Sequence, residues 1–397
     1  MIKNIIKNII KRTSLYKPLV IFKESIKYIP LIVFYYLCRM LPIENKVVFS
    51  SFAGEYFNAQ PKMIFDALNV LNNKVKVIWI LKSDIKPEGV YKVVPPYSFK
   101  EMYELATSRV WIDNRRKDYW IKKRKKQYYI QTWHGPVCIK AVEKDTEDTL
   151  PFYYVKSAIQ DSKNADCIVA ETKWRYKNIC EAFWYSGEIL KGQFIDYTHN
   201  EECLIKRKVA KYYNIKQSIG IILYAPTFRK NGNITCYNIN IPKTKKIAEE
   251  RYKKEFVFIY RLHPNIIDKQ ESIEYSDDVL NGSEYESIDE LVIASDIIIT
   301  DYSGIMFDGF RYKKNVLIYA EDIDNYIRED RKMYFDLYDL PSPISSNNQE
   351  LITNIKNFNE IEYHEKRKSF VEQLGYYDVD ASKKCAQIIN RVLRSKT

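Results

Sequence analysis

From residue 46 onward, short runs of β-branched and aromatic residues alternate with longer charged stretches that are compatible with helices. This alternation is typical of a parallel sheet covered by helices. A first series of strands is predicted at residues 46–51, 75–81, 109–113, 128–133 and 167–170, and a second series at 220–226, 256–264, 296–304 and 315–320. The sequence therefore predicts an α/β fold in which two parallel sheets follow each other along the chain.

A polar stretch around Asp196 to Ser218 separates the two series. A chain of 397 residues is too long for one small core, because domains commonly hold roughly 100 to 200 residues. We expect a first domain over residues 43–200 and a second over 201–397, preceded by a separate segment at 1–42. The last helix, roughly Val379 to Arg394, can pack back on the first domain.

The first 42 residues combine two apolar patterns. In MIKNIIKNIIKR, residues 1–12, the isoleucines share one helical face and the lysines occupy the other. The stretch YIPLIVFYYLCRMLP, residues 28–42, has an apolar core of about eleven residues, short of the ~20 needed to span a bilayer, and no small-residue cleavage site follows it. We predict a helical segment that lies in the membrane interface; the alternative is a basic helix docked on the protein's own surface.

Lysines and arginines outnumber acidic residues by 63 to 51, which gives a formal net charge of +12. The excess is concentrated in residues 1–30 and in the run 115–126, which holds eight basic residues against Asp118. Such patches favour polyanions, nucleotides or an anionic membrane surface. Nucleic acid is not expected as a partner, because only Tyr119 and Trp120 are interleaved in the second run and no nucleic-acid fold signature is visible.

Seven cysteines occur without a CxxC pair or another zinc spacing, which is typical of reduced cytosolic thiols packed as small hydrophobic side chains. Two Asp-x-Asp triplets, Asp322 to Asp324 and Asp378 to Asp380, do not end a core apolar strand. We therefore predict no metal and no cofactor, since basic side chains and a helix N-terminus suffice to hold a diphosphate.

Functional side chains gather where the predicted strands end. In open α/β sheets, ligands bind outside the carboxyl ends of the strands. Four strand ends carry such residues: His134; Thr227 and Arg229; Arg261 and His263; and Asp301, Tyr302 and Ser303. Two other histidines, His199 and His364, lie in polar surroundings away from strand ends, so we expect structural roles for them.

Two of these clusters also have a distinctive backbone. Gly135 lets the chain turn sharply and leaves room for a ligand beside the imidazole of His134. The Ser303-Gly304 turn precedes a predicted helix, whose first amides would point at a phosphate, although Ser303 could equally be a plain N-cap. Asp308, one helical turn further, could accept ribose hydroxyls or merely cap and charge the helix start.

Two arginines at strand ends suit an anionic ligand. Arg229 and Arg261 can make charge-assisted, bidentate contacts to a diphosphate. Either could instead pair with a carboxylate of its own domain, and the sequence leaves that alternative open.

Five motifs in a fixed order carry a family resemblance: QTWHGP…IKAVEKD, LYAPTFR, YRLHP, SDIIITDYSGIMFDGF and YYDVDASKKCAQII. Over about residues 45–394, the chain resembles the CDP-glycerol glycerophosphotransferases of teichoic acid and capsule synthesis. This resemblance implies a GT-B fold, in which two Rossmann-like domains face a central cleft. The first domain would hold the acceptor and the second the donor nucleotide.

The resemblance also implies an activity and its partners. Family members transfer glycerol phosphate from CDP-glycerol to a hydroxyl of a lipid-linked acceptor, a polyprenyl diphosphate glycan or glycerol phosphate, and release CMP. They act as peripheral proteins at the cytoplasmic face of the cell membrane. His134 then matches the proposed general base, while His263 and Arg229 match residues that serve the donor diphosphate. The segment that would close over the same phosphates consists of Asp301, Tyr302 and Ser303.

Three departures from the family pattern limit what is carried over. Gly304 stands where many members have a second serine, so a backbone contact to phosphate can replace a side-chain contact. KGQFIDY, residues 191–197, lacks the proline and arginine that many members carry in a segment at the end of the first domain. An arginine contact between the two domains is therefore not carried over to this chain. The spacing from His134 to Lys140 is one residue longer than in some relatives, so we assign Lys140 no role.

Several alternatives stay open. Within the enzyme class, the donor could be CDP-ribitol or a nucleotide sugar, since the phosphate-handling features would be shared. The sequence does not separate a primase that adds one glycerol phosphate from a short polymerase. A non-catalytic membrane or nucleic-acid binding protein is disfavoured, because the functional side chains cluster at strand ends.

Overall fold

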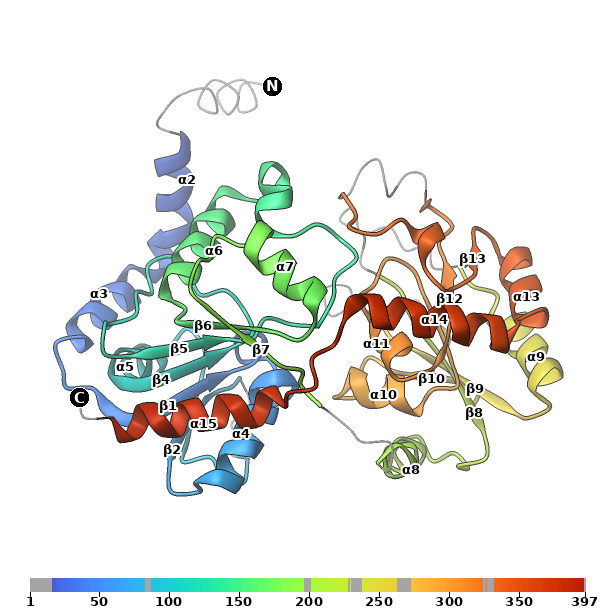
Figure 1. The fold of residues 1–397 in the computed structure, drawn as a ribbon, viewed down its shortest axis with the longest axis horizontal. Coiled ribbons are helices and arrows are strands. Elements are labelled where there is room, and N and C mark those ends of the chain that lie inside the picture. Colours follow the sequence, from blue (N-terminus) through green and yellow to red (C-terminus); the bar gives the residue numbers. More distant parts are fainter. Residues whose placement is uncertain are drawn as a thin grey trace. The chain divides into compact units, whose positions relative to one another are not determined.

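The computed structural model describes residues 16–82, 87–195, 201–227, 229, 238–262, 273–323, 326 and 332–395. These residues form two compact units. Unit 1 comprises the described parts of Met1–Pro136, Val142–Phe194 and Tyr377–Thr397, and unit 2 comprises those of Val137–Ala141 and Ile195–Tyr376. Each unit is built on a parallel sheet with helices packed against it (Figure 1).

In the described part of unit 1, the sheet has seven strands in the order β3-β2-β1-β4-β5-β6-β7, and every neighbouring pair is parallel. Its inner strands β1 and β4 are almost entirely buried, because both faces of the sheet are covered. The hydrophobic pattern predicted five of these strands and missed the short edge strands β3 and β7. The strands are β1 (Glu44–Ser50), β2 (Lys76–Ile80), β3 (Lys92–Val94), β4 (Ser108–Asp113), β5 (Tyr128–Gln131), β6 (Cys167–Ala170) and β7 (Glu188–Lys191).

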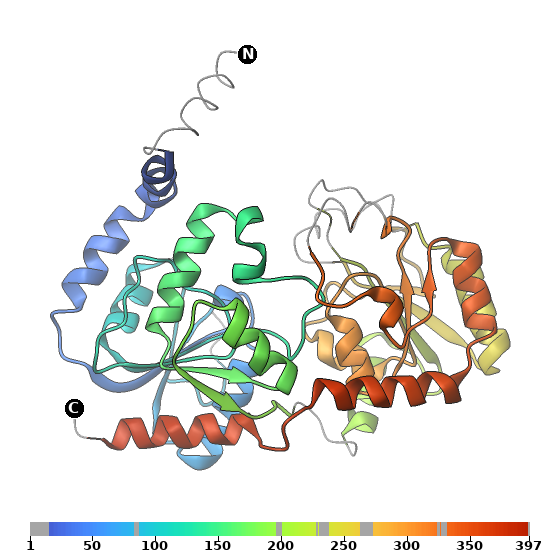
Figure 2. The same cartoon turned by 45° about the horizontal axis from the view of Figure 1, so that its top comes forward.

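Helices cover both faces of this sheet (Figure 2). Trp111 of β4 belongs to the core on one face, and its chain neighbour Ile112 belongs to the core on the other. Successive side chains of a strand point to opposite faces, so one strand serves both cores. The helices packed with Trp111 include α3 (Ile29–Cys38), α5 (Phe99–Thr107) and α7 (Lys173–Ala182), and those packed with Ile112 include α4 (Ala59–Leu71) and α15 (Ala381–Arg394).

Two segments belong to a different unit from their chain neighbours. Helix α15 packs against α4, so the end of the described chain is part of unit 1. Segment Val137–Ala141 is part of unit 2, where Ala141 N donates to Lys332 O at 2.7 Å and Tyr334 N donates to Ile139 O at 2.7 Å. The predicted range 43–200 has to be corrected for this exchange, because backbone pairing and not chain continuity decides where the segment lies.

In the described part of unit 2, the sheet has six parallel strands in the order β10-β9-β8-β11-β12-β13. They are β8 (Gly220–Ala225), β9 (Phe256–Tyr260), β10 (Val279–Asn281), β11 (Ile297–Thr300), β12 (Asn315–Tyr319) and β13 (Ile344–Ser345). The helices of this unit include α8 (Glu202–Tyr212), α9 (Ile241–Tyr252), α10 (Ile288–Ala294), α11 (Ile305–Arg311), α13 (Asn348–Lys356) and α14 (Glu360–Leu374). Helix α8 packs beside α10, and α9 packs beside α13.

The chain before the first strand is helical in its described part, with α2 (Tyr16–Ser25), a short turn Ile26–Tyr28 and then α3. Tyr35 and Cys38 of α3 are buried in the core of unit 1, so this part of the predicted 1–42 segment is docked on the protein. The predicted isoleucine face at residues 1–12 lies outside the described residues. Within residues 16–395, as far as they are described, every helix is too short or too polar to cross a bilayer.

Candidate functional site

Both sheets have a topological switch point, at which the chain connections leave adjacent strands in opposite directions. It lies between β1 and β4 in unit 1 and between β8 and β11 in unit 2. In open α/β folds, ligands bind beside the carboxyl ends of such strands. Asn114 follows β4 and Asp301 follows β11, so both residues stand at these positions.

His134 is held in a defined tautomer. Its Nδ1 atom lies 3.1 Å from the backbone carbonyl oxygen of Asn114. A carbonyl oxygen only accepts hydrogen bonds, so Nδ1 carries the proton and donates it. The Nε2 atom is therefore the proton-accepting atom of the ring.

The surroundings of His134 favour the neutral imidazole. Its side chain reaches the surface, but many protein atoms crowd around it, and this desolvation lowers the pKa of His134 below the ordinary value. The hydrogen bond to Asn114 opposes that shift, while the charge of Arg175 adds to it. Trp133 stacks on the imidazole with ring centres 4.5 Å apart and planes inclined by 21°. A neutral, oriented imidazole is suited to accept a proton near neutral pH.

The turn after His134 is fixed from helix α7 and its N-terminus. Gly135 has a φ of 87°, in the left-handed region that suits glycine. Arg175 Nη2 donates to the carbonyl oxygen of Gly135 at 3.1 Å, and Thr172 Oγ1 donates to that of Pro136 at 3.2 Å. The sequence pattern did not single out these supporting residues, although Thr172 follows the predicted strand 167–170 as His134 follows 128–133.

A buried ion-pair network lies against the ring of Trp133. Arg116 contacts Glu143 at 3.0 Å and Asp161 at 3.2 Å, and its guanidinium carbon is 5.2 Å from the Trp133 ring centre. Gln131 Nε2 donates to Asp161 at 3.2 Å, and Gln131 Oε1 accepts from Trp133 N at 2.9 Å. The charge pattern placed Arg116 in a run suited to polyanions. That interpretation is wrong for Arg116, because a buried cation needs internal partners.

Arg229 joins two carboxylates of unit 2. Its Nη1 lies 2.8 Å from Asp301 Oδ2, while Nε and Nη2 lie 2.7 and 2.9 Å from the two carboxylate oxygens of Asp322. Burial alone would raise the pKa of Asp322, but the hydrogen bond and charge of Arg229 outweigh it and hold the pKa below its usual range. Pairing within its own unit, which the sequence left open for Arg229, is what the structure shows. The predicted contact of Arg229 to a donor diphosphate stays a prediction.

Asp301 also fixes the backbone at the ends of β8 and β11. Its Oδ1 accepts from Thr227 N at 2.8 Å and from Tyr302 N at 2.6 Å. The Tyr302 hydroxyl donates to Asp322 Oδ1 at 3.0 Å, and its ring stacks on Tyr326 with ring centres 3.8 Å apart. The structure thus brings together Thr227, Asp301 and Tyr302, which the sequence had proposed from two separate strand ends.

Ser303 and Gly304 are the more exposed part of this segment. Ser303 Oγ accepts a long hydrogen bond from Ile305 N at 3.5 Å, while Gly304 occupies the N-cap position of α11. Gly304 has a φ of −60°, and among the described residues a Cβ atom placed there would have Val137 O as its neighbour, at 3.9 Å. A serine, as in the family pattern, would therefore fit at Gly304 without strain.

Arg261 is engaged in backbone contacts. Its Nη1 donates to the carbonyl oxygens of Gly282 at 2.7 Å and Tyr285 at 2.6 Å, which braces the loop between β10 and α10. Asp308 is half-buried in the first turn of α11. Neither side chain is in the Arg229 and Asp301 cluster as far as the described contacts show, so their predicted roles toward a donor stay predictions.

Of the remaining histidines, His263 and His199 lie outside the described residues. His364 lies in α14, where its Nδ1 accepts from Arg367 Nε at 3.3 Å. This contact within one helix fits the structural role that we expect for His364.

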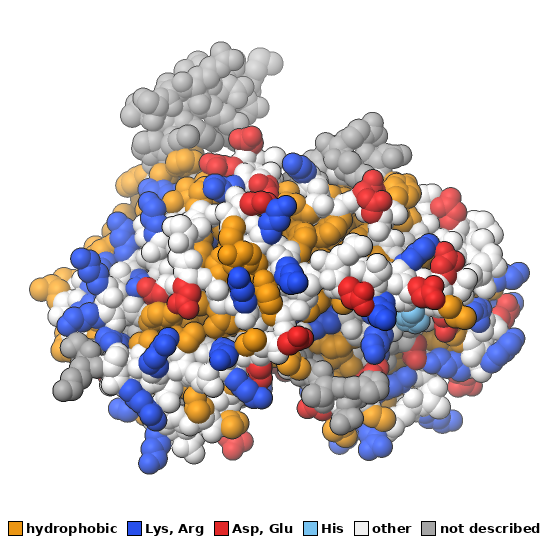
Figure 3. All heavy atoms as spheres, viewed as in Figure 1, with side chains coloured by type: hydrophobic (Ala, Val, Ile, Leu, Met, Phe, Trp, Pro, Cys, Tyr) orange, Lys and Arg blue, Asp and Glu red, His pale blue; other side chains and the backbone are white. Residues whose placement is uncertain are grey.

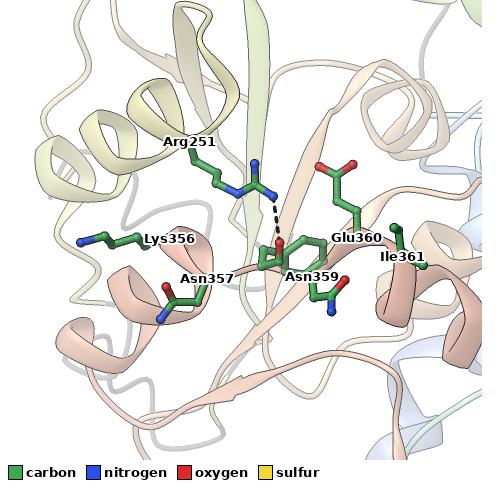
Figure 4. A pocket seen from close by; sticks show the side chains of 7 residues that line it. Arg251, Lys356, Asn357, Asn359, Glu360 and Ile361 are labelled. Carbon is green, nitrogen blue, oxygen red and sulfur yellow. Dashed lines mark hydrogen bonds between the residues drawn. The ribbon is translucent and has the colours of Figure 1, made fainter.

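A pocket of about 580 Å³ lies between the end of α9 and the connection from α13 to α14 (Figure 4). Arg251 Nη2 donates to Phe358 O at 3.0 Å beside it, and Lys356, Asn359 and Glu360 also line it. None of the predicted site residues is among its described lining residues. Within the described ranges, no group of three or more His, Cys, Asp or Glu side chains is arranged to hold a metal ion.

The chain is similar to known enzymes of teichoic acid synthesis. A teichoic acid glycerol-phosphate transferase of Staphylococcus aureus is 29% identical over 374 residues, which cover 89% of this chain and 95% of that protein. A teichoic acid poly(glycerol phosphate) polymerase of Bacillus spizizenii is 26% identical over 369 residues, which cover 88% of this chain and 93% of that protein.

Among solved structures, the wall teichoic acid polymerase TagF superposes with a TM-score of 0.78 at 22% identity, over 95% of this chain and 98% of that chain. This likeness confirms the predicted fold class, which is α/β and GT-B-like with two parallel sheets. The model of the family described as CDP-Glycerol:Poly(glycerophosphate) glycerophosphotransferase matches residues 33–394, and the chain belongs to that family.

Proposed function

We propose that this chain transfers glycerol phosphate from CDP-glycerol to a hydroxyl of a lipid-linked acceptor and releases CMP. Family membership over residues 33–394 supports the reaction class. The observation that carries the mechanism is the hydrogen bond from His134 Nδ1 to the carbonyl oxygen of Asn114 at 3.1 Å. It leaves Nε2 of His134 as a proton acceptor on a neutral ring.

In the proposed step, the acceptor hydroxyl oxygen attacks the β-phosphorus of the donor in line with the bond to CMP. The new oxygen–phosphorus bond forms as the bond to CMP breaks, and CMP leaves with the electron pair. The hydroxyl proton passes to Nε2 of His134. A positioned general base of this kind contributes ~10²- to 10⁴-fold to the rate.

For the donor, we assign direct contacts to the exposed Ser303-Gly304 turn and to His263. Arg229 would act indirectly. It pairs with Asp301, and Asp301 accepts a hydrogen bond from the backbone of Tyr302, just before the turn. Phosphoryl transfer depends mainly on positioning and on stabilising charge, so a rigid frame behind the turn is a useful contribution.

The donor alcohol is tested directly. The purified chain is offered CDP-glycerol, CDP-ribitol and nucleotide sugars in turn with one lipid acceptor, and the products are identified by mass spectrometry. We expect a mass increase of one or more glycerol phosphate units. A ribitol phosphate product is the second candidate, since a teichoic acid poly(ribitol-phosphate) polymerase of Bacillus spizizenii is also 25% identical to this chain. Product length in the same experiment separates priming from polymerisation.

We further propose that the N-terminal segment associates with an anionic membrane surface. Exposed apolar side chains on α2, on the following turn, on α3 and just after α3 support this, namely Phe22, Ile26, Val33, Leu37 and Met40. Deleting residues 1–42 would also remove the buried Tyr35 and Cys38, so it would damage the core of unit 1. Replacing Val33 and Leu37 by serine is the cleaner test, and we expect weaker binding to anionic liposomes with unchanged melting temperature.

A further inference from the structure

Unit 1 carries a groove that the proposed reaction does not use. It has a volume of about 410 Å³ and is lined by residues of α3, of segment 119–122 and of α6 (Phe152–Asn164). Three lysines and three aromatic residues dominate its lining: Lys122, Lys156, Lys163, Tyr36, Tyr119 and Trp120. None of the described lining residues is acidic. The groove therefore combines positively charged side chains with an apolar wall.

Hydrogen bonds between α3 and segment 119–122 shape the wall. The Tyr35 hydroxyl donates to the carbonyl oxygen of Lys122 at 2.8 Å, and the Tyr36 hydroxyl donates to that of Trp120 at 3.2 Å. These bonds hold the backbone that carries Lys122 against a helix that is itself anchored in the core. A pre-formed wall lowers the conformational entropy that the protein loses when a ligand binds.

The lysines of the groove lack a carboxylate partner within it. Lys156 Nζ lies 4.0 Å from the centre of the Tyr119 ring. Burial lowers the pKa of Lys156, and the like charge of Lys122 lowers it further. The nearby carboxylate of Asp118 is engaged by the hydroxyl of Tyr153 at 3.0 Å. A bound anion would offset the repulsion between the two ammonium groups.

An apolar stripe continues from the groove along α3. Val33 and Leu37 lie one helical turn apart on α3 and are 55% and 58% exposed, and Met40, in the turn after this helix, is 82% exposed. In the space-filling view, hydrophobic and basic side chains lie side by side over this part of unit 1 (Figure 3). A ligand with an anionic head and an apolar tail matches both features together.

We propose that the groove binds the phosphate headgroup of an anionic membrane phospholipid, whose acyl chains lie along the stripe of Val33, Leu37 and Met40. This inference rests on the proposed membrane association and makes it specific. Membrane contact would then include a defined lipid site in addition to diffuse attraction of the basic chain to negative charge.

The test compares two charge reversals of equal size in the full chain. Lys122→Glu with Lys156→Glu reverses the charge of two of the three groove lysines, and Lys125→Glu with Lys126→Glu changes exposed lysines outside its lining. Co-sedimentation uses phosphatidylcholine vesicles with and without phosphatidylglycerol. The groove variant should lose about tenfold or more of its affinity for phosphatidylglycerol vesicles beyond the loss in the control, since each basic residue near such a surface adds appreciably to binding. Equal losses in the two variants would overturn the proposal.

Two further measurements test whether the lipid itself occupies the groove. Brominated phosphatidylglycerol should quench tryptophan fluorescence in the wild type and much less in the groove variant, because Trp120 lines the groove. Inorganic phosphate should displace the wild type from phosphatidylglycerol vesicles no more than salt of the same ionic strength does. Displacement by phosphate alone would indicate a site for soluble phosphate and would reject the lipid site.

The proposed lipid site and the proposed reaction can be rejected independently of each other. The groove variant should keep its melting temperature and its rate with a water-soluble acceptor analogue. If the wild type binds phosphatidylglycerol through the groove but transfers no glycerol phosphate, the proposed function is rejected and the lipid site stands. If it transfers glycerol phosphate while the groove variant binds vesicles as well as the control does, the lipid site is rejected alone.

Discussion

The carbonyl oxygen of Asn114 accepts a hydrogen bond from Nδ1 of His134 at 3.1 Å. These residues follow the neighbouring strands β4 and β5, which pair in parallel and so bring their ends to the same edge. The Asn114 side chain is fixed in turn, because its Oδ1 accepts from Phe52 N at 2.7 Å just after β1. Three strand ends thus form one hydrogen-bonded frame that sets the orientation and tautomer of the imidazole.

Replacing His134 by alanine removes the proposed proton acceptor. We expect turnover of CDP-glycerol to fall by at least ~100-fold, since a positioned general base contributes that much or more. Donor affinity, measured by titration calorimetry, should stay nearly unchanged. His364→Ala is the matched control and should retain turnover, because His364 lies within α14 and contacts Arg367. Unchanged turnover in His134→Ala would remove this residue from the mechanism.

The pH dependence of the reaction follows from the lowered pKa of His134. Protonation blocks Nε2, so kcat/KM should rise with pH through a pKa below the ordinary ~6.5 and be level above it. In the same acidic window the unfolded chain binds more protons at this residue than the folded chain, so folding stability should also rise with pH there. A pH profile of kcat/KM checks the first point, and an inflection above neutral pH would contradict it.

Arg229→Met should destabilise unit 2, because it leaves Asp301 and Asp322 without their shared cation. Removing one partner of a buried ion pair typically costs about 3 kcal/mol, and Arg229 is only 7% exposed. Thermal unfolding should show a clearly lower midpoint than for Arg207→Met, a change at an exposed position of α8. Adding Asp322→Leu to Arg229→Met should recover part of the loss, since it removes one of the stranded carboxylates. Identical midpoints for Arg229→Met and Arg207→Met would refute this account.

Two glycine substitutions should differ sharply in effect. Gly304→Ser should change stability by less than about 0.5 kcal/mol and retain activity, because Gly304 has an ordinary φ and room for a Cβ atom. Gly135→Ala should cost about 1 to 2 kcal/mol, because its φ of 87° is unfavourable for a residue with a Cβ. Strain at Gly135 would also displace His134, so turnover should fall. Denaturant unfolding and initial rates for both variants provide the comparison.

Several residues of the candidate site could be proposed from the sequence, because the rule for parallel sheets depends only on where each strand ends. Each apolar strand ends at a position that the hydrophobic pattern marks, and the carboxyl ends share one edge. This rule led us to propose His134, Thr227 and Asp301, although it did not single out Asn114, which also follows a predicted strand. The rule could not assign ion-pair partners to Arg229. One of the two carboxylates that pair with it, Asp322, follows β12 and comes near Arg229 only when the sheet has formed.

By itself, the sequence determined two successive parallel sheets, the strand ends that carry polar chemistry and the family resemblance, because hydrophobic periodicity and motif order are properties of the chain. The tertiary structure decided which nitrogen of His134 holds the proton, which carboxylates hold Arg229, and that Arg116 is internal to unit 1. It also decided that segment 137–141 pairs within unit 2 and that α15 packs in unit 1. Hydrogen bonds and ion pairs of buried groups are formed with whichever partners the packed fold brings near, and separation along the chain places no limit on that choice.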